Sequence, residues 1–271
     1  MNEIYCSLRK VDPLSTFESL QTTSSRDFPA VWYDSAPEDH FWMTWRLRVI
    51  LEHLRRLSLE GRAEVKAFDI GCGHGAFQRQ MRAVSSWTID GCDLNENAIS
   101  LSRGHNGGSF LYNIFELRKD LQHKYDVVFL LDVIEHIQNP VEFLSTARFY
   151  MKRGGYMVIN VPAIPVLYSK YDVAVGHIRR YTKHSLSSEL SAAELTVETV
   201  TYWGLSLVIL AALRKAALAF IKPQAVIRRG FVPPSIIADK ILRLVMSAEL
   251  AMARDVPYGA SLLAIVREAT S

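Results

Sequence analysis

The chain has 271 residues, of which 49% are apolar and 22% charged, and its net charge at pH 7 is +3. A chain of this length can bury a core without disulfides, and its composition excludes a low-complexity, disordered protein. The small net charge gives no reason to expect nucleic acid as a partner.

The cysteines and the N-terminus indicate a compartment. Cys6, Cys72 and Cys92 are odd in number and lack metal-ligand spacing, which argues against a disulfide framework and a structural zinc site. The stretch MNEIYCSLRK lacks the basic flank and apolar core of a secretory signal. We therefore expect a cytoplasmic protein in a reducing environment.

The first 60 residues predict an arm followed by a cap helix. The opening 35 or so residues are rich in Ser, Thr and Pro and have no clear period, which is typical of irregular structure. Within 39–59, apolar residues such as Trp45 and Ile50 recur at helical spacing, and arginines, Arg46 among them, fill the polar remainder. We expect an amphipathic helix there.

From residue 65 the pattern changes to short apolar runs that alternate with stretches of helical length. Runs that are apolar at consecutive positions suit strands buried on both faces, as in a parallel sheet covered by helices. The predicted strands are VKAFDI, WTIDGCD, SFLYN, YDVVFLL and GGYMVINV, followed later by LTVETVTYWG and GASLLAIVRE. Two helical patterns, 205–221 and 234–253, lie between the last two strands.

A glycine-rich loop follows the first predicted strand. FDIGCGHGAF places Asp69 before Gly71, Gly73 and Gly75, at the start of a predicted helix. Glycines let the backbone approach a ligand closely, and a helix N-terminus offers unpaired N–H groups. The spacing differs from the dinucleotide pattern, and the acid would repel a pyrophosphate but could hold an ammonium group. The alternative is an ordinary tight strand-to-helix turn.

A second acid ends the next predicted strand. Asp93, in GCDLNENAI, occupies the place where this class of fold puts a carboxylate that binds ribose hydroxyls. Its alternative role is the N-cap of the helix that begins near Asn95, and the two roles are compatible.

At this point the sequence resembles the class I S-adenosylmethionine-dependent methyltransferases. The resemblance rests on FDIGCGHGAF, GCDLNENAI, YDVVFLLDVIEHIQNP and GGYMVINVP, in the order and spacing of that family. It implies an α/β, Rossmann-like seven-stranded sheet whose last strand is antiparallel, with a helical N-terminal cap and a two-helix insertion between the sixth and seventh strands. We expect an arm and cap over 1–60, a core over 61–204, a helical insertion over 205–258 and a final core strand over 259–271.

The resemblance also implies a role for each cofactor-binding residue, with S-adenosylmethionine as the cofactor. The loop would wrap the methionine portion, Asp93 would bind the ribose, Leu94 and the residues after the third strand would contact the adenine, and the end of the fourth strand would line the methionine site. The set is Asp69, Gly71, Cys72, Gly73, Gly75, Asp93, Leu94, Asn113, Ile114, Leu131 and Asp132.

Methyl transfer needs mainly positioning of a nucleophile, and a general base is optional. Glu135 and His136 lie just beyond the fourth strand, and His136 could accept a proton at neutral pH. The alternative is structural, with both side chains bonding the sheet edge or a helix start. We find no convincing cluster of acidic and histidine ligands in the sequence and expect no metal.

The segment 162–183 is expected to form a lid over the active site. It contains HIRRYT, and its pattern of Asp172, His177, Arg179, Arg180 and Tyr181 resembles bacterial methyltransferases of the type 23 grouping. His177 and Tyr181 are candidate catalytic residues. Arginine forks suit an anionic acceptor, so the candidate substrate-binding residues are Tyr168, Tyr171, Arg179 and Arg180. The alternative is that Asp172 and the arginines form ion pairs that fasten the loop.

The insertion over 205–258 concentrates positive charge, with eight Lys/Arg against three acids. Its first helix is too short and too charged to span a bilayer. It could lie on a membrane surface, form a homodimer or wall the acceptor site, and the simplest alternative is burial against the helix at 236–252.

The predicted function is S-adenosylmethionine-dependent methyl transfer to a small metabolite or natural-product intermediate. One alternative is a membrane-lipid or lipid-linked glycan acceptor, with peripheral membrane contact. A second is a cyclase that uses the cofactor's methionine portion and releases methylthioadenosine. A third is a noncatalytic binding module. The fold does not specify the nucleophile.

Overall fold

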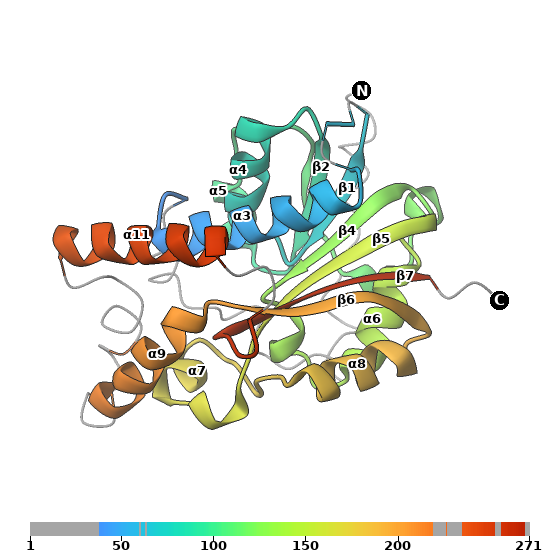
Figure 1. The fold of residues 1–271 in the computed structure, drawn as a ribbon. Helices are drawn as coiled ribbons and strands as arrows, with labels where there is room; N and C mark the ends of the chain where they lie inside the picture. The colour runs from blue at the N-terminus through green and yellow to red at the C-terminus, as the bar shows by residue number, and fades with distance from the viewer. Residues whose placement is uncertain are drawn as a thin grey trace.

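The computed structural model describes residues 38–59, 61–62, 64–218, 226, 235–252 and 256–268. It contains a seven-stranded sheet in the order β3-β2-β1-β4-β5-β7-β6, in which β7 runs antiparallel to both of its neighbours (Figure 1). The strands are β1 (Lys66–Ile70), β2 (Thr88–Asp93), β3 (Ser109–Leu111), β4 (Tyr125–Leu131), β5 (Met151–Pro162), β6 (Leu195–Trp203) and β7 (Ser261–Glu268). The predicted Rossmann-like sheet is confirmed, and the expected N-terminal arm lies outside the described residues.

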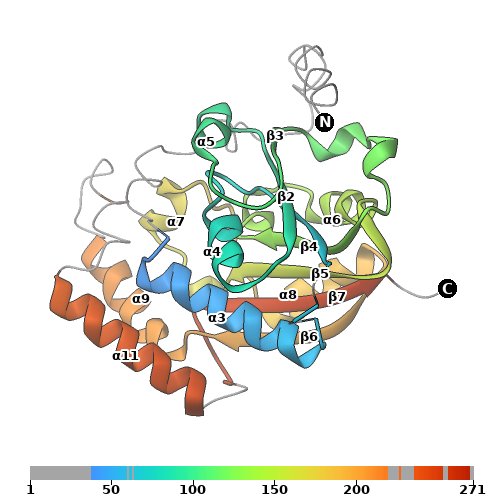
Figure 2. The ribbon, with the colours of Figure 1, turned by 90° about the horizontal axis from the view of Figure 1, so that it is seen from above.

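Helices cover both faces of this sheet (Figures 1 and 2). Side chains of α3, α4 and α11 pack on one face, and those of α6 and α8 pack on the other. The helices are α3 (Phe41–Arg56), α4 (Ala76–Val84), α5 (Glu96–Leu101), α6 (Pro140–Arg148), α7 (Lys170–Ala174), α8 (Lys183–Ala192), α9 (Leu205–Leu218) and α11 (Ile236–Met252). Short 3-10 helices are η1 (Ile114–Glu116), η2 (Lys119–Leu121), η3 (Ile134–His136) and η4 (Pro165–Leu167).

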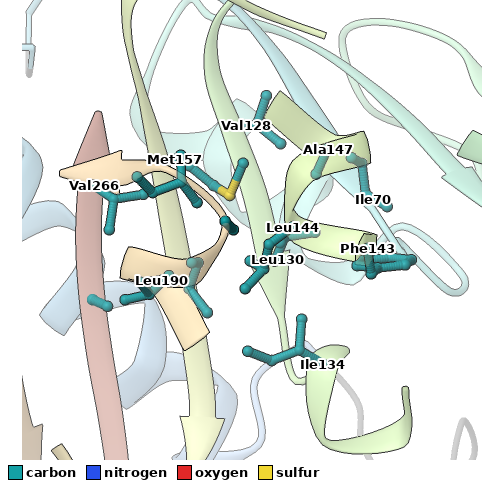
Figure 3. Close-up of a cluster of buried hydrophobic side chains, with 14 of the residues drawn as sticks. Ile70, Val128, Leu130, Ile134, Phe143, Leu144, Ala147, Met157, Leu190 and Val266 are labelled. Atoms are coloured by element: carbon teal, nitrogen blue, oxygen red, sulfur yellow. The ribbon is translucent and has the colours of Figure 1, made fainter. Parts of the chain in front are cut away.

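Strand β4 shows why the apolar runs are continuous. Val127 and Phe129 belong to the core under α3 and α4, whereas Val128 and Leu130 belong to the core under α6 and α8. Figure 3 shows Leu130 beside Leu144 of α6, in the second of these cores. A strand at the centre of the sheet thus needs apolar side chains at successive positions.

The N-terminal helix forms where its period predicted it. His40 caps α3 by accepting the backbone N–H of Trp42 at 3.2 Å, and Trp45 and Ile50 are buried against the sheet. One position differs from expectation: Arg46, predicted on the polar side, is only 6% exposed. α3 therefore places a charged group in the core.

The segment 162–183 is more regular than predicted. It contains η4 and α7, and Ala163 and Tyr181 pair as a parallel β-bridge that closes it. Ser169 and Asp172 form a capping box at the start of α7. The side chain of each residue accepts a hydrogen bond from the backbone N–H of the other. The prolines therefore limit only the first residues of this lid segment.

The insertion packs on more than itself. Helices α9 and α11 touch each other, but α9 also lies against α7 and η4, and α11 lies against α3. Apolar side chains stay exposed on both helices, with Ile209 at 70% and Leu244 at 72%. Mutual burial of the two helices is therefore only part of the arrangement. Among the described residues, no helix is long and apolar enough to cross a membrane.

Glu249 of α11 fixes the start of α9. Its carboxylate accepts four hydrogen bonds, from the backbone N–H groups of Gly204, Leu205 and Ser206 and from the Ser206 hydroxyl, at 2.8 to 3.0 Å. We expect Glu249→Ala to lower the free energy of unfolding by about 1–2 kcal/mol, because it removes the acceptor at a helix N-terminus.

Urea unfolding of the two proteins measures this change. The matched control is Glu64→Ala, at an exposed position before β1. Equal losses in both variants would contradict the capping role of Glu249.

Candidate active site

The glycine loop between β1 and α4 adopts a backbone that other residues resist. Gly71, Gly73 and Gly75 have φ of 78°, 53° and 78°, in the left-handed region. A Cβ on Gly71 would lie 2.6 Å from a methyl group of Val133. The N–H groups of Gly71 and Cys72 both bond the carbonyl of Cys92, at 2.7 and 3.0 Å. These two hydrogen bonds hold the start of the loop against the end of β2.

Asp93 clamps this loop from the end of β2. Its two carboxylate oxygens accept the N–H groups of Gly73, at 2.9 Å, and of Asn95, at 2.8 Å. Burial raises the pKa of Asp93, and these hydrogen bonds oppose the rise. The N-cap of α5 is Asn95, whose side chain accepts from Ala98, so the alternative N-cap role of Asp93 is wrong.

Asp69 lies one strand away and is only 2% exposed. Burial raises its pKa from 3.8 to about 7. The positive charge of Arg46 lowers this pKa, and the negative charge of Asp93 raises it further. The carboxyl group lies two residues before Gly71, at the start of the glycine loop. With this pKa it is partly protonated near neutral pH. It is a second acid near Asp93, which is half-buried.

The remaining expected cofactor residues follow strands at the same edge. Asn113 caps η1 with its side-chain oxygen, which accepts the Phe115 N–H at 3.1 Å. That oxygen has a second lone pair, so contact with an adenine amino group remains compatible with capping. Ile114 and Leu131 are buried, and Leu94 is half-buried. The set is therefore contiguous along β1, β2, β3 and β4, as the resemblance implies.

Asp132 has partners that sequence reasoning missed. Arg46 of α3 pairs with its Oδ2 at 2.5 Å, and the Asn160 amide donates to its Oδ1 at 2.8 Å. The indole N–H of Trp203 in turn donates to Asn160 at 2.9 Å. Asp132 itself has a φ of 61°, which turns the chain out of β4. Ile50, one turn further along the same helix face as Arg46, was the sequence signal for this buried arginine.

The lid segment is organised by a second buried ion pair. Asp172 is fully buried, and its Oδ1 lies 2.7 Å from Arg180 Nε and 3.0 Å from His177 Nδ1. Arg180 also donates to the carbonyl of Ala163 at 3.0 Å. The pKa of Asp172 is held well below its ordinary value by His177 and Arg180, although burial raises it. These contacts fit the alternative in which the arginines fasten the loop.

The other candidate lid residues also have protein partners. Arg179 pairs with Glu189 at 3.5 Å and donates to the Gln138 carbonyl at 3.0 Å. Tyr181 is 1% exposed and donates to the Ile134 carbonyl at 3.3 Å. The Tyr168 hydroxyl donates to the His177 carbonyl at 2.6 Å.

Tyr171, the last candidate, is 6% exposed under the guanidinium of Arg214, which lies 4.3 Å from its ring centroid. A role of these lid residues in binding an acceptor stays a prediction.

Glu135 and His136 form the turn after β4. Glu135 is fully buried, and burial raises its pKa well above the ordinary value. His136 Nδ1 lies 3.0 Å from the Gly176 carbonyl, and burial together with His177 lowers its pKa to about 3. His136 is therefore neutral at pH 7 and a weak proton acceptor. This contact joins the turn after β4 to the lid segment.

Comparison with known proteins agrees with this geometry. A family profile described as a methyltransferase domain, of the type 23 group, matches residues 28–200. A ubiquinone biosynthesis O-methyltransferase of Marinobacter nauticus is 31% identical over 140 residues, which are 48% of this chain and 56% of that protein. The protein of the same name from Bordetella avium is 28% identical, with the same coverage. The chain thus spans about half the length of these curated relatives.

Solved structures resemble the chain in fold. A methyltransferase from Archaeoglobus fulgidus, described as dependent on S-adenosylmethionine, superposes with a TM-score of 0.50 at 19% identity, over 83% of this chain and 97% of that one. The 4+2 cyclase SpnF has a TM-score of 0.54 at 13% identity, over 85% and 82%. At these identities the likeness concerns the fold alone.

Asp93 should control cofactor affinity. Asp93→Asn removes the negative charge that holds the loop and faces the expected ribose site, so the dissociation constant for S-adenosylmethionine should rise at least about tenfold. Isothermal titration calorimetry measures it, with Asp120→Asn, an exposed partner of Arg118, as the control. Unchanged affinity in a folded Asp93→Asn protein would place the cofactor elsewhere.

The raised pKa of Asp69 predicts a pH-dependent stability. Between about pH 4 and 7 the native state keeps a proton that the unfolded chain has lost, so rising pH favours unfolding across this window. Relative to Asp69→Asn, the cofactor-free protein should lose up to about 1.4 kcal/mol per pH unit there and stay level above about pH 7. Urea unfolding of both proteins from pH 5 to 8 tests this, and a constant difference would show that Asp69 ionises normally.

Proposed function

Because this chain belongs to the type 23 family of the methyltransferase domain, we propose that it transfers the methyl group of S-adenosylmethionine to an oxygen atom of a small-molecule acceptor. The chain is an S-adenosylmethionine-dependent methyltransferase, and the acceptor is the part that we propose. The observation that carries the proposal is the glycine loop clamped by Asp93 at the carboxyl edge, in a chain whose curated relatives are named O-methyltransferases.

The residues of the site fit this cofactor. Three glycines at alternate positions with left-handed φ leave backbone where side chains would intrude, and a half-buried carboxylate lies at the end of β2. The loop from Gly71 to Gly75 would hold the methionine portion and Asp93 the ribose, while Leu94, Asn113 and Ile114 would line the adenine. When bound, the cofactor supplies a methyl carbon made electrophilic by a positively charged sulfur.

The chain's own contribution is chiefly positioning. Burial leaves His136 with a pKa of about 3, so this imidazole holds a proton poorly at neutral pH. A strong general base at this position is therefore disfavoured. Alignment of an acceptor hydroxyl in a site that excludes water supplies the larger share of catalysis in such a reaction.

A second candidate acceptor carries a lipid tail. The observation that favours it is the exposure of large apolar side chains on α9 and α11, with lysines on the same helices, as on proteins that lie at a membrane surface. These residues are Ile209, Leu213, Lys215, Ile237, Lys240 and Leu244. A homodimer through the same helices is the alternative use of this surface.

Product analysis tests the function. Incubation with methyl-labelled S-adenosylmethionine and metabolite extract should yield S-adenosylhomocysteine together with one labelled acceptor, and Asp93→Asn should slow both while Asp120→Asn does not. Label in the aqueous phase supports a small metabolite, and label in the organic phase supports a lipid-linked acceptor. Methylthioadenosine without a labelled acceptor would contradict methyl transfer and indicate cyclisation.

A further inference from the structure

Three side chains that commonly bind metals converge between η3 and the lid segment. Glu135 and His136 belong to η3, and His177 follows α7. One ligand atom from each residue lies within 4.8 Å of the others. His177 Nε2 is 3.7 Å from Glu135 Oε1, and the two imidazole centroids are 4.9 Å apart. Donors around a tetrahedral ion are about 3.4 Å apart when each is about 2.1 Å from it, so a small contraction would complete the site.

Each imidazole is held through Nδ1. His177 Nδ1 lies 3.0 Å from the Asp172 carboxylate, and His136 Nδ1 lies 3.0 Å from the Gly176 carbonyl. Both partners only accept hydrogen bonds, so the proton of each neutral ring is assigned to Nδ1 and the lone pair to Nε2. A carboxylate or carbonyl behind the ring is the arrangement that orients histidines as metal ligands.

Glu135 supplies an independent reason to expect a cation site. Its side chain is 0% exposed, and neither carboxylate oxygen has a hydrogen-bond partner among the described residues. Buried carboxylates are ordinarily paired, bonded or coordinated to a metal, because an uncompensated one destabilises the fold. His177 Nε2 lies 3.7 Å from Glu135 Oε1, beyond hydrogen-bond distance.

The other charges near Glu135 are already matched. Asp132 pairs with Arg46, and Asp172 pairs with Arg180. Of the three carboxylates Asp132, Glu135 and Asp172, Glu135 is the one that forms no ion pair with an arginine of the described residues. A divalent cation would take the place of the proton that a buried, unpaired carboxylate otherwise needs.

We propose that Glu135, His136 and His177 bind one divalent transition-metal ion, of the class of Zn²⁺, which ties the lid segment to the turn after β4. Two imidazole nitrogens and a carboxylate oxygen suit such an ion, whereas Mg²⁺ and Ca²⁺ prefer oxygen ligands alone. Three protein ligands leave a coordination position for an oxygen atom at the carboxyl edge of the sheet. The sequence predicted no metal because the ligands come from segments far apart in the chain.

Cobalt binding tests the proposal without cofactor or acceptor. The full chain, treated with a chelator and dialysed, is titrated with Co²⁺, whose visible absorption is strong in four- or five-coordinate sites and weak in water. We expect strong bands that saturate at one equivalent per chain and vanish when Zn²⁺ is added. A wild-type chain that gives only the weak spectrum of hydrated Co²⁺ would overturn the proposal.

Variants then locate the ion. Glu135→Gln and His177→Asn should each weaken binding at least about 100-fold, and Asp172→Asn, behind His177, about 10–100-fold. The control is His184→Asn, at an exposed position on α8, which should bind as the wild type does. Circular dichroism of the metal-free proteins identifies any variant that fails to fold. Full binding by a folded Glu135→Gln or His177→Asn protein would place the ion elsewhere and overturn the proposal.

Hydrogen exchange reports the structural role. Zn²⁺ should slow exchange of amides in residues 172–181 of the wild type and leave β3 unchanged. Equal exchange with and without a bound ion would contradict the link between metal and lid. Because these measurements use neither S-adenosylmethionine nor acceptor, a failure of methyl transfer and a failure of metal binding are told apart.

Discussion

Carboxylates buried at the carboxyl edge of the sheet are the constraint on which the rest of the site depends. Asp69 and Asp93 lie near the ends of β1 and β2, and Asp132 follows β4. Asp69 is buried, and the other two are half-buried. A buried carboxylate is stable only when cations, hydrogen bonds or protons compensate it. The chain meets this requirement with Arg46 for Asp132 and with backbone N–H groups of the glycine loop and α5 for Asp93, and these contacts fix where the surrounding segments lie.

Two ion pairs show how compensation shapes the fold. Arg46 joins α3 to the end of β4 through Asp132, and Asp132 is linked by Asn160 to Trp203 of β6. Arg180, near the C-terminal end of the lid segment, pairs with Asp172 at the start of α7. Breaking either pair would leave a buried charge, at a cost of about 3–5 kcal/mol. The cap helix and the lid segment are thus fixed by electrostatics as much as by apolar packing.

The sequence predicts the sheet well because its signal is local. Continuous apolar runs such as YDVVFLL mark strands buried on both faces, and β4 covers Tyr125–Leu131 as expected. The glycine loop and Asp93 are equally local, since the required backbone and strand end are set within a few residues.

Long-range pairing is what the sequence does not reveal. The helical period assigned Arg46 to the polar side of the helix. The period cannot show that Asp132 lies beside the buried face of α3, where it pairs with Arg46. For the same reason the sequence did not reveal that His177 lies close to Glu135. The two residues are far apart in the chain, and the fold of the lid segment brings them together. Residue identities alone left Arg180 equally suited to a substrate anion and to Asp172.

The pairing of the lid arginines bears on the acceptor. Arg180 presents its guanidinium to Asp172 and to the Ala163 carbonyl, and Arg179 is engaged with Glu189 and the Gln138 carbonyl. An anionic acceptor that recruited Arg180 would have to compete for its guanidinium with the buried Asp172 carboxylate, 2.7 Å away. A neutral acceptor meets no such competition, because it needs only hydrogen bonds and contact with apolar groups. The arginines of HIRRYT therefore favour a hydroxyl-bearing neutral acceptor, held by a lid whose own charges are already satisfied.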